Sequence, residues 1–159
     1  MIKKVTINDL DLNSRDGLYY KKYDVTPYTG DVEGQEQGKF KNGVKEGSWV
    51  FYYNNGKLLT KGNFKNGKKE GTWEHYHDSG KLREKGKFMN SHEEGFWEGY
   101  WEDGQLNYKG KFENGKKEGS WVWYHYNGQI MSQGHYENDN KVGYWVAYNE
   151  GGHLLEEET

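Results

Sequence analysis

The chain has 159 residues, enough for one domain of ordinary size or for several copies of a smaller unit. Leu, Ile, Val and Phe together number only 26, which argues against an ordinary two-layer aliphatic core, whereas an aromatic content of 17% argues against disorder. The formal net charge of −3 gives no overall attraction to nucleic acid, and the absence of Cys excludes disulfides, thiolate chemistry and Cys-ligated zinc.

Hydropathy gives no sign of a membrane or export segment. No window approaches the ~18 apolar residues of a membrane span, and no apolar run follows the basic residues Lys3 and Lys4. We therefore expect a cytoplasmic location for the chain as written, or a secreted or periplasmic location if a signal peptide has been removed.

Residues 1–46 contain a degraded copy of a unit that is much clearer downstream. Its recognisable positions lie 24 residues before their counterparts in the first clear unit: Tyr28, Gly38, Phe40 and Asn42-Gly43. Val25 stands where the clear units have Trp. Because repeat arrays need a closing unit at each end, we predict that residues 1–46 form an N-terminal cap.

A 24-residue repeat follows, with full units at residues 47–70, 71–94, 95–118 and 119–142 and a partial unit at 143–152. Every unit begins with Gly-x-Trp, and the Trp column is Trp49, Trp73, Trp97, Trp121 and Trp145. A Tyr column stands three residues later: Tyr52, Tyr76, Tyr100, Tyr124 and Tyr148. Residues 153–159 (HLLEEET) are predicted to form a C-terminal acidic cap, whose Glu run discourages edge-to-edge association.

Each unit is predicted to form two β-strands. The segments WVFYY and KLLTKGNF are rich in aromatic and β-branched residues, and the turn signals Asn55-Gly56 and Asn66-Gly67 follow them. No segment has an apolar stripe with helical spacing. The predicted fold is all-β, an elongated, open and twisted antiparallel β-meander with one hairpin per repeat, advancing about 9.5 Å per repeat.

The length of the first turn decides which side chains share a face. A two-residue turn predicts three cross-strand pairs: Trp49 with Gly62, Phe51 with Thr60, and Tyr53 with Leu58. The Trp column, the Leu column and the ring at Phe64 then share one face, with each indole over its cross-strand Gly, and the Tyr column lies on the other face. The alternative, a three-residue turn with a bulge, shifts the pairing by one residue and regroups both faces.

The frame GxWxxYxxxGxLxxxGxFxNGKKEG resembles the MORN-repeat variant found in bacterial YwqK-type antitoxins. The stretch from Gly62 to Gly71 is the part most similar to an ordinary MORN unit, and residues 15–30 resemble the opening of such proteins. The resemblance covers roughly residues 15–155 and departs at Asn90-Ser91 and Asn138-Asp139, where the Asn-Gly turn is altered. It implies a scaffold or binding role, and the antitoxin role comes from the resemblance alone.

The candidate catalytic and metal-binding residues are interpreted as structural or solvated. His75 and His77 would share one strand face and could begin a metal site, but they stand where the preceding unit has aromatic residues. Glu74 and Glu98 align in neighbouring units at about 9.5 Å, near the carboxylate separation of inverting glycosidases, but a repeat generates such pairs automatically. We predict no enzymatic activity, no catalytic residue, no metal site, no cofactor and no small-molecule substrate.

Two patterns could indicate lipid, nucleic acid or sugar ligands, but neighbouring residues argue against each of them. The Lys-Lys-Glu turns at residues 68–70 and 116–118 could bind lipid head groups at a membrane surface, as proposed for eukaryotic MORN proteins, but each turn carries its own Glu and residues 92–94 are acidic. Tyr rows beside Lys61, Lys85 and Lys109 could stack nucleic acid bases or sugar rings. The fold needs these rings itself, which argues against such partners.

Two Trp residues depart from the repeat, because Trp101 and Trp123 stand where the first unit has Tyr and Phe. Trp and Tyr are enriched at interface hot spots. We therefore predict a protein-binding face around residues 95–126, formed by Trp101, Trp123, Tyr100 and Tyr124. The favoured function is a non-catalytic scaffold for protein–protein interaction with an antitoxin- or immunity-like role. The alternative is a carbohydrate-, anionic-lipid- or single-stranded-nucleic-acid-binding module that uses the aromatic rows.

Overall fold

The computed structural model describes residues 4–158, and the predicted caps at 1–46 and 153–159 include residues 1–3 and 159, which lie outside that range. The first part of the chain comprises η1 (Ile7–Asp9), β1 (Leu10–Leu12), β2 (Tyr19–Lys21), β3 (Gly30–Val32) and β4 (Glu36–Lys41). The repeats form β5 (Val44–Tyr52), β6 (Leu58–Lys65), β7 (Lys68–Tyr76), β8 (Leu82–Met89), β9 (His92–Tyr100), β10 (Leu106–Glu113), β11 (Lys116–Tyr124), β12 (Ile130–Glu137), β13 (Asn140–Tyr148) and β14 (Leu154–Glu158).

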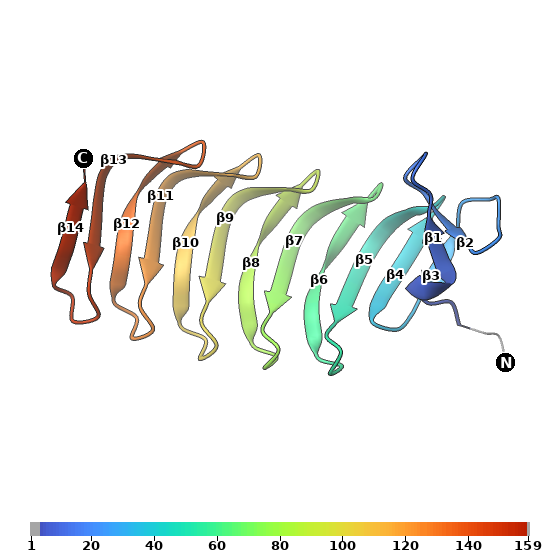
Figure 1. Cartoon of the computed structure of the whole chain (residues 1–159), viewed down its shortest axis with the longest axis horizontal. Helices are drawn as coiled ribbons and strands as arrows, with labels where there is room; N and C mark the ends of the chain where they lie inside the picture. The colour runs from blue at the N-terminus through green and yellow to red at the C-terminus, as the bar shows by residue number, and fades with distance from the viewer. Residues whose placement is uncertain (1–3, 159) are drawn as a thin grey trace.

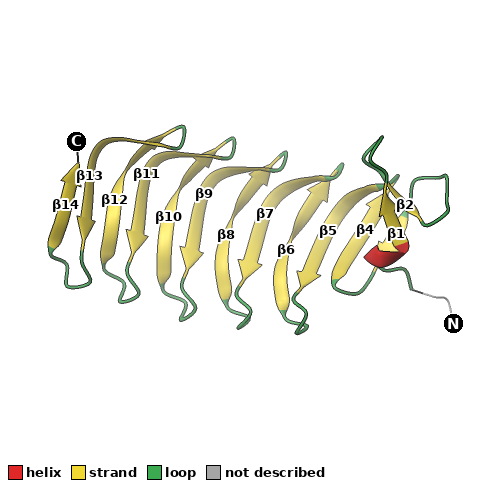
Figure 2. Cartoon of the chain, viewed as in Figure 1, coloured by secondary structure: helices red, strands yellow, loops and turns green. Residues whose placement is uncertain are grey.

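The predicted β-meander is confirmed. Within residues 4–158, the strands β3 to β14 form one twelve-stranded antiparallel sheet in sequence order, and β1 and β2 form a separate two-stranded sheet at its N-terminal end. The strands lie side by side along the long axis of the molecule, and the loops alternate between two edges (Figures 1 and 2). Across residues 4–158, no helix combines the length and apolarity that crossing a bilayer requires.

The first turn of each unit has three residues instead of two. In the first full unit, the Tyr53 N–H donates to the Lys57 carbonyl at 2.8 Å, and the Gly56 N–H donates to the Tyr53 carbonyl at 2.9 Å. Tyr52 therefore pairs with Leu58. The predicted pairing of Tyr53 with Leu58 is wrong, because the turn also includes the residue before Asn55-Gly56.

A β-bulge next to this turn restores the predicted register along the rest of the hairpin. The bulge leaves Leu59 without a partner, so Phe51 pairs with Thr60 and Trp49 pairs with Gly62, as predicted. Cross-strand partners share a face and successive residues alternate between faces, so the Leu column lies with the Tyr column. The predicted grouping of the Leu column with the Trp column is wrong. The longer turn and the bulge change the cross-strand pairing only at the turn end of the hairpin, where Leu58 now pairs with Tyr52.

The second turn of each unit has two residues and leads into a bent strand. Asn66 and Gly67 have φ values of 50° and 76°, typical of the type I′ turn that joins hairpin strands. Two other turns keep left-handed φ values without Gly at the second position: Asn90-Ser91 and Asn138-Asp139. The register then shifts by two residues between Lys61 and Asn63, with Gly71 at a φ of 71° in the bulge. The strands β5, β7, β9, β11 and β13 curve after these turns (Figure 1).

The Trp column forms the core of the sheet, and each of its members is at most 5% exposed. Each indole lies over a Gly in the preceding strand, where an added Cβ would lie 2.1–2.3 Å from the nearest indole atom: Gly38, Gly62, Gly86, Gly110 and Gly134. Trp49 therefore covers Gly38, whereas Trp73 covers Gly62. The prediction that an indole covers its cross-strand partner is wrong, because the bulge at Gly71 brings the following Trp over that Gly instead.

Aromatic rings between successive Trp residues join the units into a continuous array. Phe64 lies 5.9 Å from Trp49 and 5.1 Å from Trp73, with interplanar angles of 79° and 88°. Edge-to-face pairs of this kind contribute about 0.5–1.5 kcal/mol beyond area burial. Phe88, Phe112 and Tyr136 make the same contacts in later units. A single sheet layer thus acquires a hydrophobic core without an aliphatic second layer.

The N-terminal end of this array is closed by residues outside the repeat. Phe40 is fully buried, and the cluster around it contains Leu10 and Val32. The ring of Tyr19 lies 4.8 Å from the ring of Phe40. Val25 is 91% exposed, so it does not replace the missing Trp. The aliphatic side chains that the repeats lack are used at this end.

Candidate functional site

The sheet presents two faces, which differ in what covers their aromatic rings. We call the face that carries the Trp column the tryptophan face, and the face that carries the Tyr column the tyrosine face. On the tryptophan face, a Lys ammonium lies 4.3–5.0 Å from the centre of the Trp ring in four units: Lys45, Lys69, Lys117 and Lys141. Burial lowers the pKa of Lys69. These lysines cover the rings that would otherwise be available for stacking.

The third unit has Glu93 in place of this lysine, and it also lacks an aromatic ring that other units have on the tryptophan face. Gly99 replaces the ring that precedes the Tyr column, and Tyr108 on the paired strand fills the vacated space. The Tyr108 ring stacks on Trp121 at 5.8 Å, and its hydroxyl donates to a Glu84 carboxylate oxygen at 2.7 Å. Burial and this hydrogen bond raise the pKa of Tyr108 well above its ordinary value. Tyr108 thus supplies a ring from the neighbouring strand.

On the tyrosine face, two bonded groups of Lys, Glu and Tyr each join a lysine of one unit to a glutamate and a tyrosine of the next. The Lys61 ammonium lies 2.8 Å from Glu74 and 5.7 Å from the centre of the Tyr76 ring, and the Tyr76 hydroxyl donates to Glu74. Hydrogen bonds from Lys61 and Tyr76 lower the pKa of Glu74. Lys85, Glu98 and Tyr100 repeat this arrangement. The two aligned carboxylates therefore each bind a lysine and a tyrosine of their own.

At the edge with the three-residue turns, one side chain per unit bonds to the backbone of the next unit. The Tyr53 hydroxyl donates to the Tyr76 carbonyl at 2.7 Å, and the Trp101 indole N–H donates to the Tyr124 carbonyl at 3.3 Å. His77 and His125 contact the next Tyr carbonyl through Nε2 at 2.9 Å and 2.8 Å. These residues share a position in the repeat, so Tyr, His and Trp fill one structural role as hydrogen-bond donors.

The histidine pair considered as the start of a metal site is divided between two roles. His75 stacks on Trp73 at 6.4 Å, and burial lowers the pKa of His75. His77 bonds to a backbone carbonyl of the next unit. Among residues 4–158, no three His, Asp or Glu side chains gather in a way that could hold a metal ion.

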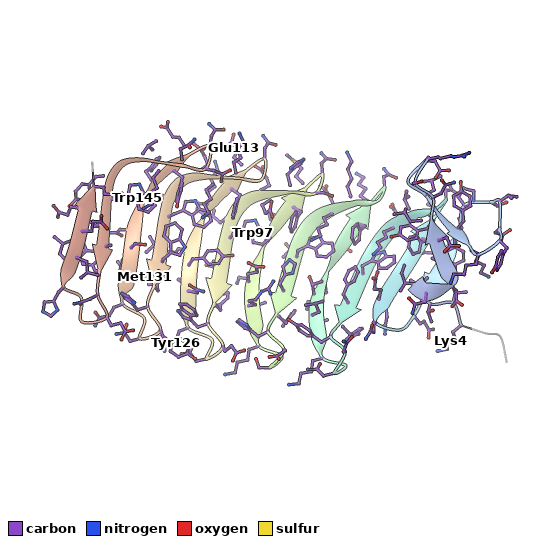
Figure 3. All side chains as sticks on the ribbon, viewed as in Figure 1. Lys4, Trp97, Glu113, Tyr126, Met131 and Trp145 are labelled. Atoms are coloured by element: carbon purple, nitrogen blue, oxygen red, sulfur yellow. The ribbon has the colours of Figure 1, made fainter. Side chains whose placement is uncertain are left out.

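The four residues predicted to bind a partner do not share one surface. Tyr100 and Tyr124 lie on the tyrosine face, whereas Trp123 is half-buried on the tryptophan face and stacks on Trp121 at 5.4 Å. Trp101 lies at the turn edge, 5.7 Å from the ring of Tyr126, which marks that edge in Figure 3. Protein binding by this set stays a prediction, and the structure brings only the two tyrosines onto a common face.

The turn glutamates, considered from sequence only as opposing lipid binding by the neighbouring lysines, hold neighbouring units together. The Glu70 carboxylate accepts from the Asn90 N–H at 3.2 Å, and the Glu118 carboxylate accepts from the Asn138 N–H at 3.0 Å. The Glu46 and Glu94 carboxylates each accept the equivalent N–H bond from the Asn of the next two-residue turn. The regular 24-residue spacing of these glutamates indicated a structural role. It could not identify their partners, because each partner N–H lies 20 residues further along the chain, at the next two-residue turn.

The exposed rings of the tyrosine face were missed as a site. Phe96 is 80% exposed and Tyr144 is 54% exposed, and both stand in the column that holds Ser48, Thr72 and Ser120 in the other units. An open hollow of about 300 Å³ lies beside Ser120, with Tyr144, Val122 and Val146 in its lining. The signal in the sequence was the exchange of small polar residues for rings in this column.

Comparison with known proteins agrees with the hairpin architecture. A search of curated proteins found no match. The family model described as "MORN repeat variant" matches residues 45–66, 69–90, 93–114 and 117–138, and each segment contains one hairpin, from β5–β6 through β11–β12. The matched segments cover more than half of the 159 residues. With four consecutive matches on four consecutive hairpins of one open sheet, the chain belongs to the MORN repeat variant family.

Proposed function

We propose that this chain is a non-catalytic scaffold that binds a protein partner through its tyrosine face. The observation that carries the proposal is the 80% exposure of Phe96, at a position where three other units have Ser or Thr. A large apolar side chain gains nothing for the fold when it projects into water. Exposed aromatic side chains are, in contrast, the usual anchors of protein interfaces.

The family supports the same conclusion. MORN repeats are generally scaffold or binding modules, and they are non-catalytic. An antitoxin or immunity protein, which occludes the active surface of its partner, is the specific form that we propose. A long open sheet suits this role because it offers a broad contact area, as stable protein interfaces require.

The proposed alternative, a carbohydrate-, anionic-lipid- or nucleic-acid-binding module that uses aromatic rows, has less support. The rings of four of the five Trp residues in the column lie beneath lysines of this chain, and the rings of Tyr76, Tyr100 and Tyr124 lie beneath Lys61, Lys85 and Lys109. Bases and sugars stack on free ring faces. The rows that suggested this function are therefore occupied by internal contacts.

Affinity purification from the source organism tests the scaffold proposal. The tagged chain is compared with a Phe96→Ser/Tyr144→Ser variant, which restores the small residue of the other units, and with Tyr126→Ser as a matched control that removes an exposed ring at the turn edge. We expect the double variant to lose a specific partner that the wild type and Tyr126→Ser retain. Equal recovery from all three correctly folded proteins would contradict binding through the tyrosine face.

The antitoxin form has its own test. The recovered partner is expressed in the source organism with and without this chain, and growth is measured. We expect growth arrest by the partner alone and rescue by the wild-type chain, with rescue lost in the Phe96→Ser/Tyr144→Ser variant. A partner that leaves growth unchanged when expressed alone would rule out the antitoxin form while leaving the scaffold role intact.

A further inference from the structure

The tyrosine face loses its charged cross-strand pairs near the C-terminal end of the sheet. In the preceding units, pairs on this face combine a lysine with a glutamate: Lys61 with Glu74, Lys85 with Glu98, Lys87 with Glu94, and Lys111 with Glu118. Where β12 meets β13, close to the C-terminal end in Figure 1, the equivalent pairs are Gln133 with Val146 and His135 with Val142. These four positions therefore carry neither a lysine nor a carboxylate.

The hollow of about 300 Å³ beside Ser120 lies in this part of the face. Its apolar lining comes from Val122 and Val146, and Val146 is only 6% exposed. Tyr144, which is 54% exposed, gives the hollow an aromatic side. The Tyr144 hydroxyl donates to a Glu157 carboxylate oxygen at 2.6 Å, so a bond within the protein holds this ring in place. The hollow is thus formed before any partner binds, as binding sites usually are.

Three polar side chains also line the hollow: Ser120, Gln133 and His135. Within residues 4–158, none of the three side chains forms a hydrogen bond with another protein group. The equivalent pair in the first unit is already bonded, because the Ser48 hydroxyl donates to the Asn63 side-chain oxygen at 2.8 Å. The hollow beside Ser120 therefore combines an apolar lining with polar groups that are free to bond to a ligand.

We infer that this hollow binds a tyrosine or tryptophan side chain of the protein partner. The inference rests on the proposed scaffold function and names the side chain that the partner inserts. Its ring contacts the two valines and the Tyr144 ring, and its hydroxyl or indole N–H bonds to one of the three free polar side chains. Tyrosine and tryptophan combine a large apolar body with one polar atom, and they are the usual anchors of protein interfaces.

Other occupants match the lining less well. A lysine, arginine or carboxylate would lose hydration without meeting an opposite charge among the lining residues. An aliphatic side chain would displace water from the polar groups and leave them without a partner. A sugar ring carries hydroxyls around its whole edge, and those against Val122 and Val146 would be left without hydrogen bonds. Because ligand pockets range from about 300 to 1,000 Å³, this hollow has room for a single side chain.

The chain contains an internal comparison for this inference. A hollow of about 270 Å³ lies at the equivalent place three units earlier, between Ser48 and Thr72. Lys61 and Glu74 line it and form an ion pair at 2.8 Å, and Thr72 stands where the later hollow has Tyr144. The sheet therefore forms such hollows by its geometry. The copy beside Ser120 differs from the earlier one in its aromatic side and in the absence of an ion pair.

Two variants give the hollow the residues of the earlier copy. Gln133→Lys/Val146→Glu restores the Lys–Glu pair, and Gln37→Lys/Val50→Glu is its matched control, because Gln37 and Val50 form the equivalent pair of β4 and β5. Tyr144→Thr removes the aromatic side of the hollow, and Phe96→Thr is its matched control, since it removes an exposed ring that does not line the hollow. Circular dichroism verifies that all four proteins fold.

Nuclear magnetic resonance titration of the ¹⁵N-labelled full chain tests the inference. The probes are uncharged five-residue peptides of Gly and Ser with a central Tyr or Trp, and the comparison peptides have a central Leu, Lys or Glu. Methyl glucoside is titrated in parallel. We expect the aromatic probes to shift the amide signals of Val122, Gly134 and Val146 in the wild type and in both controls. The comparison peptides should bind at least about fivefold more weakly.

Binding of the aromatic probes should weaken about tenfold in Gln133→Lys/Val146→Glu and in Tyr144→Thr. Equal binding to the variants and the wild type overturns the inference, as does an absence of binding or equal binding of the Leu peptide. Shifts at the hollow caused by methyl glucoside and not by the aromatic probes overturn it in favour of a sugar. If the probes fail while the native partner is still captured through Phe96 and Tyr144, the aromatic anchor is refuted and the scaffold function stands.

Discussion

Replacing Gly86 with Ala tests whether the indole of the following unit restricts this column to Gly. The added Cβ would lie 2.1 Å from Cδ2 and 2.2 Å from Cε2 of Trp97, which is only 3% exposed. The indole has little room to move, since the rings of Phe88 and Phe112 lie 5.2 Å and 5.9 Å from it. Overpacking of this kind costs about 1–3 kcal/mol, and a conflict with three indole atoms places Gly86→Ala at about 2–3 kcal/mol of lost unfolding free energy.

The control is Gly95→Ala, which separates steric conflict from backbone strain. Gly95 has a φ of 72°, and an added Cβ would meet no heavy atom within 4 Å, so its substitution costs only the left-handed conformation, about 1–2 kcal/mol. Urea unfolding at room temperature, followed by fluorescence and circular dichroism, measures both. In a Trp97→Ala background, Gly86→Ala should cost less than about 1 kcal/mol, whereas Gly95→Ala should keep its cost. An equal cost of Gly86→Ala in both backgrounds would refute the reasoning.

Three further predictions concern side chains that join neighbouring strands or units. Tyr108→Ala removes the ring that fills the space at Gly99, so we expect thermal or urea unfolding to show a loss of about 3 kcal/mol, and a loss below 1 kcal/mol would contradict that packing role. Glu118→Ala removes the acceptor of the Asn138 N–H and should cost about 1 kcal/mol, with faster amide exchange at Asn138. Glu74→Gln should cost about 0.5–1 kcal/mol at pH 7. Because the pKa of Glu74 is lowered in the folded state, this difference should disappear as the pH falls below the ordinary value of 4.5, and a constant difference down to pH 3 would contradict it.

The period of the sequence was sufficient to predict the fold. Residues at fixed 24-residue spacing, with turn signals between strand-like segments, led directly to an open meander with one hairpin per repeat. The register was predicted correctly for Trp49 and Phe51 but not for Tyr53, because a bulge at Leu59 compensates for a longer turn. A compensation between two irregularities leaves no trace in the spacing of the repeat.

The candidate site was harder to predict, because departures from the repeat have two different causes. Trp101 stands out as a possible functional residue when it is compared with Tyr53 and His77 at the same repeat position. All three donate a hydrogen bond to the next unit, so this position requires a donor and not a particular ring. Gly99 departs because Tyr108 replaces its missing ring. Phe96 departs with a ring that is 80% exposed, and this exposure distinguishes it from the other two cases.

The contacts between units give the array a direction. Each indole covers a Gly of the unit before it, and each donor at the turn edge bonds to the unit after it. A unit inserted or removed in whole multiples of 24 residues reproduces both contacts, so the array can lengthen or shorten by duplication or deletion without new side chains. The two ends, by contrast, are not interchangeable. The first end must cover a ring, Phe40, whereas at the last end β13 pairs Trp145 with Glu158, where the full units pair Trp with Gly. Gain or loss of whole units is therefore expected within the repeats, from β5 to β12, where both contacts recur.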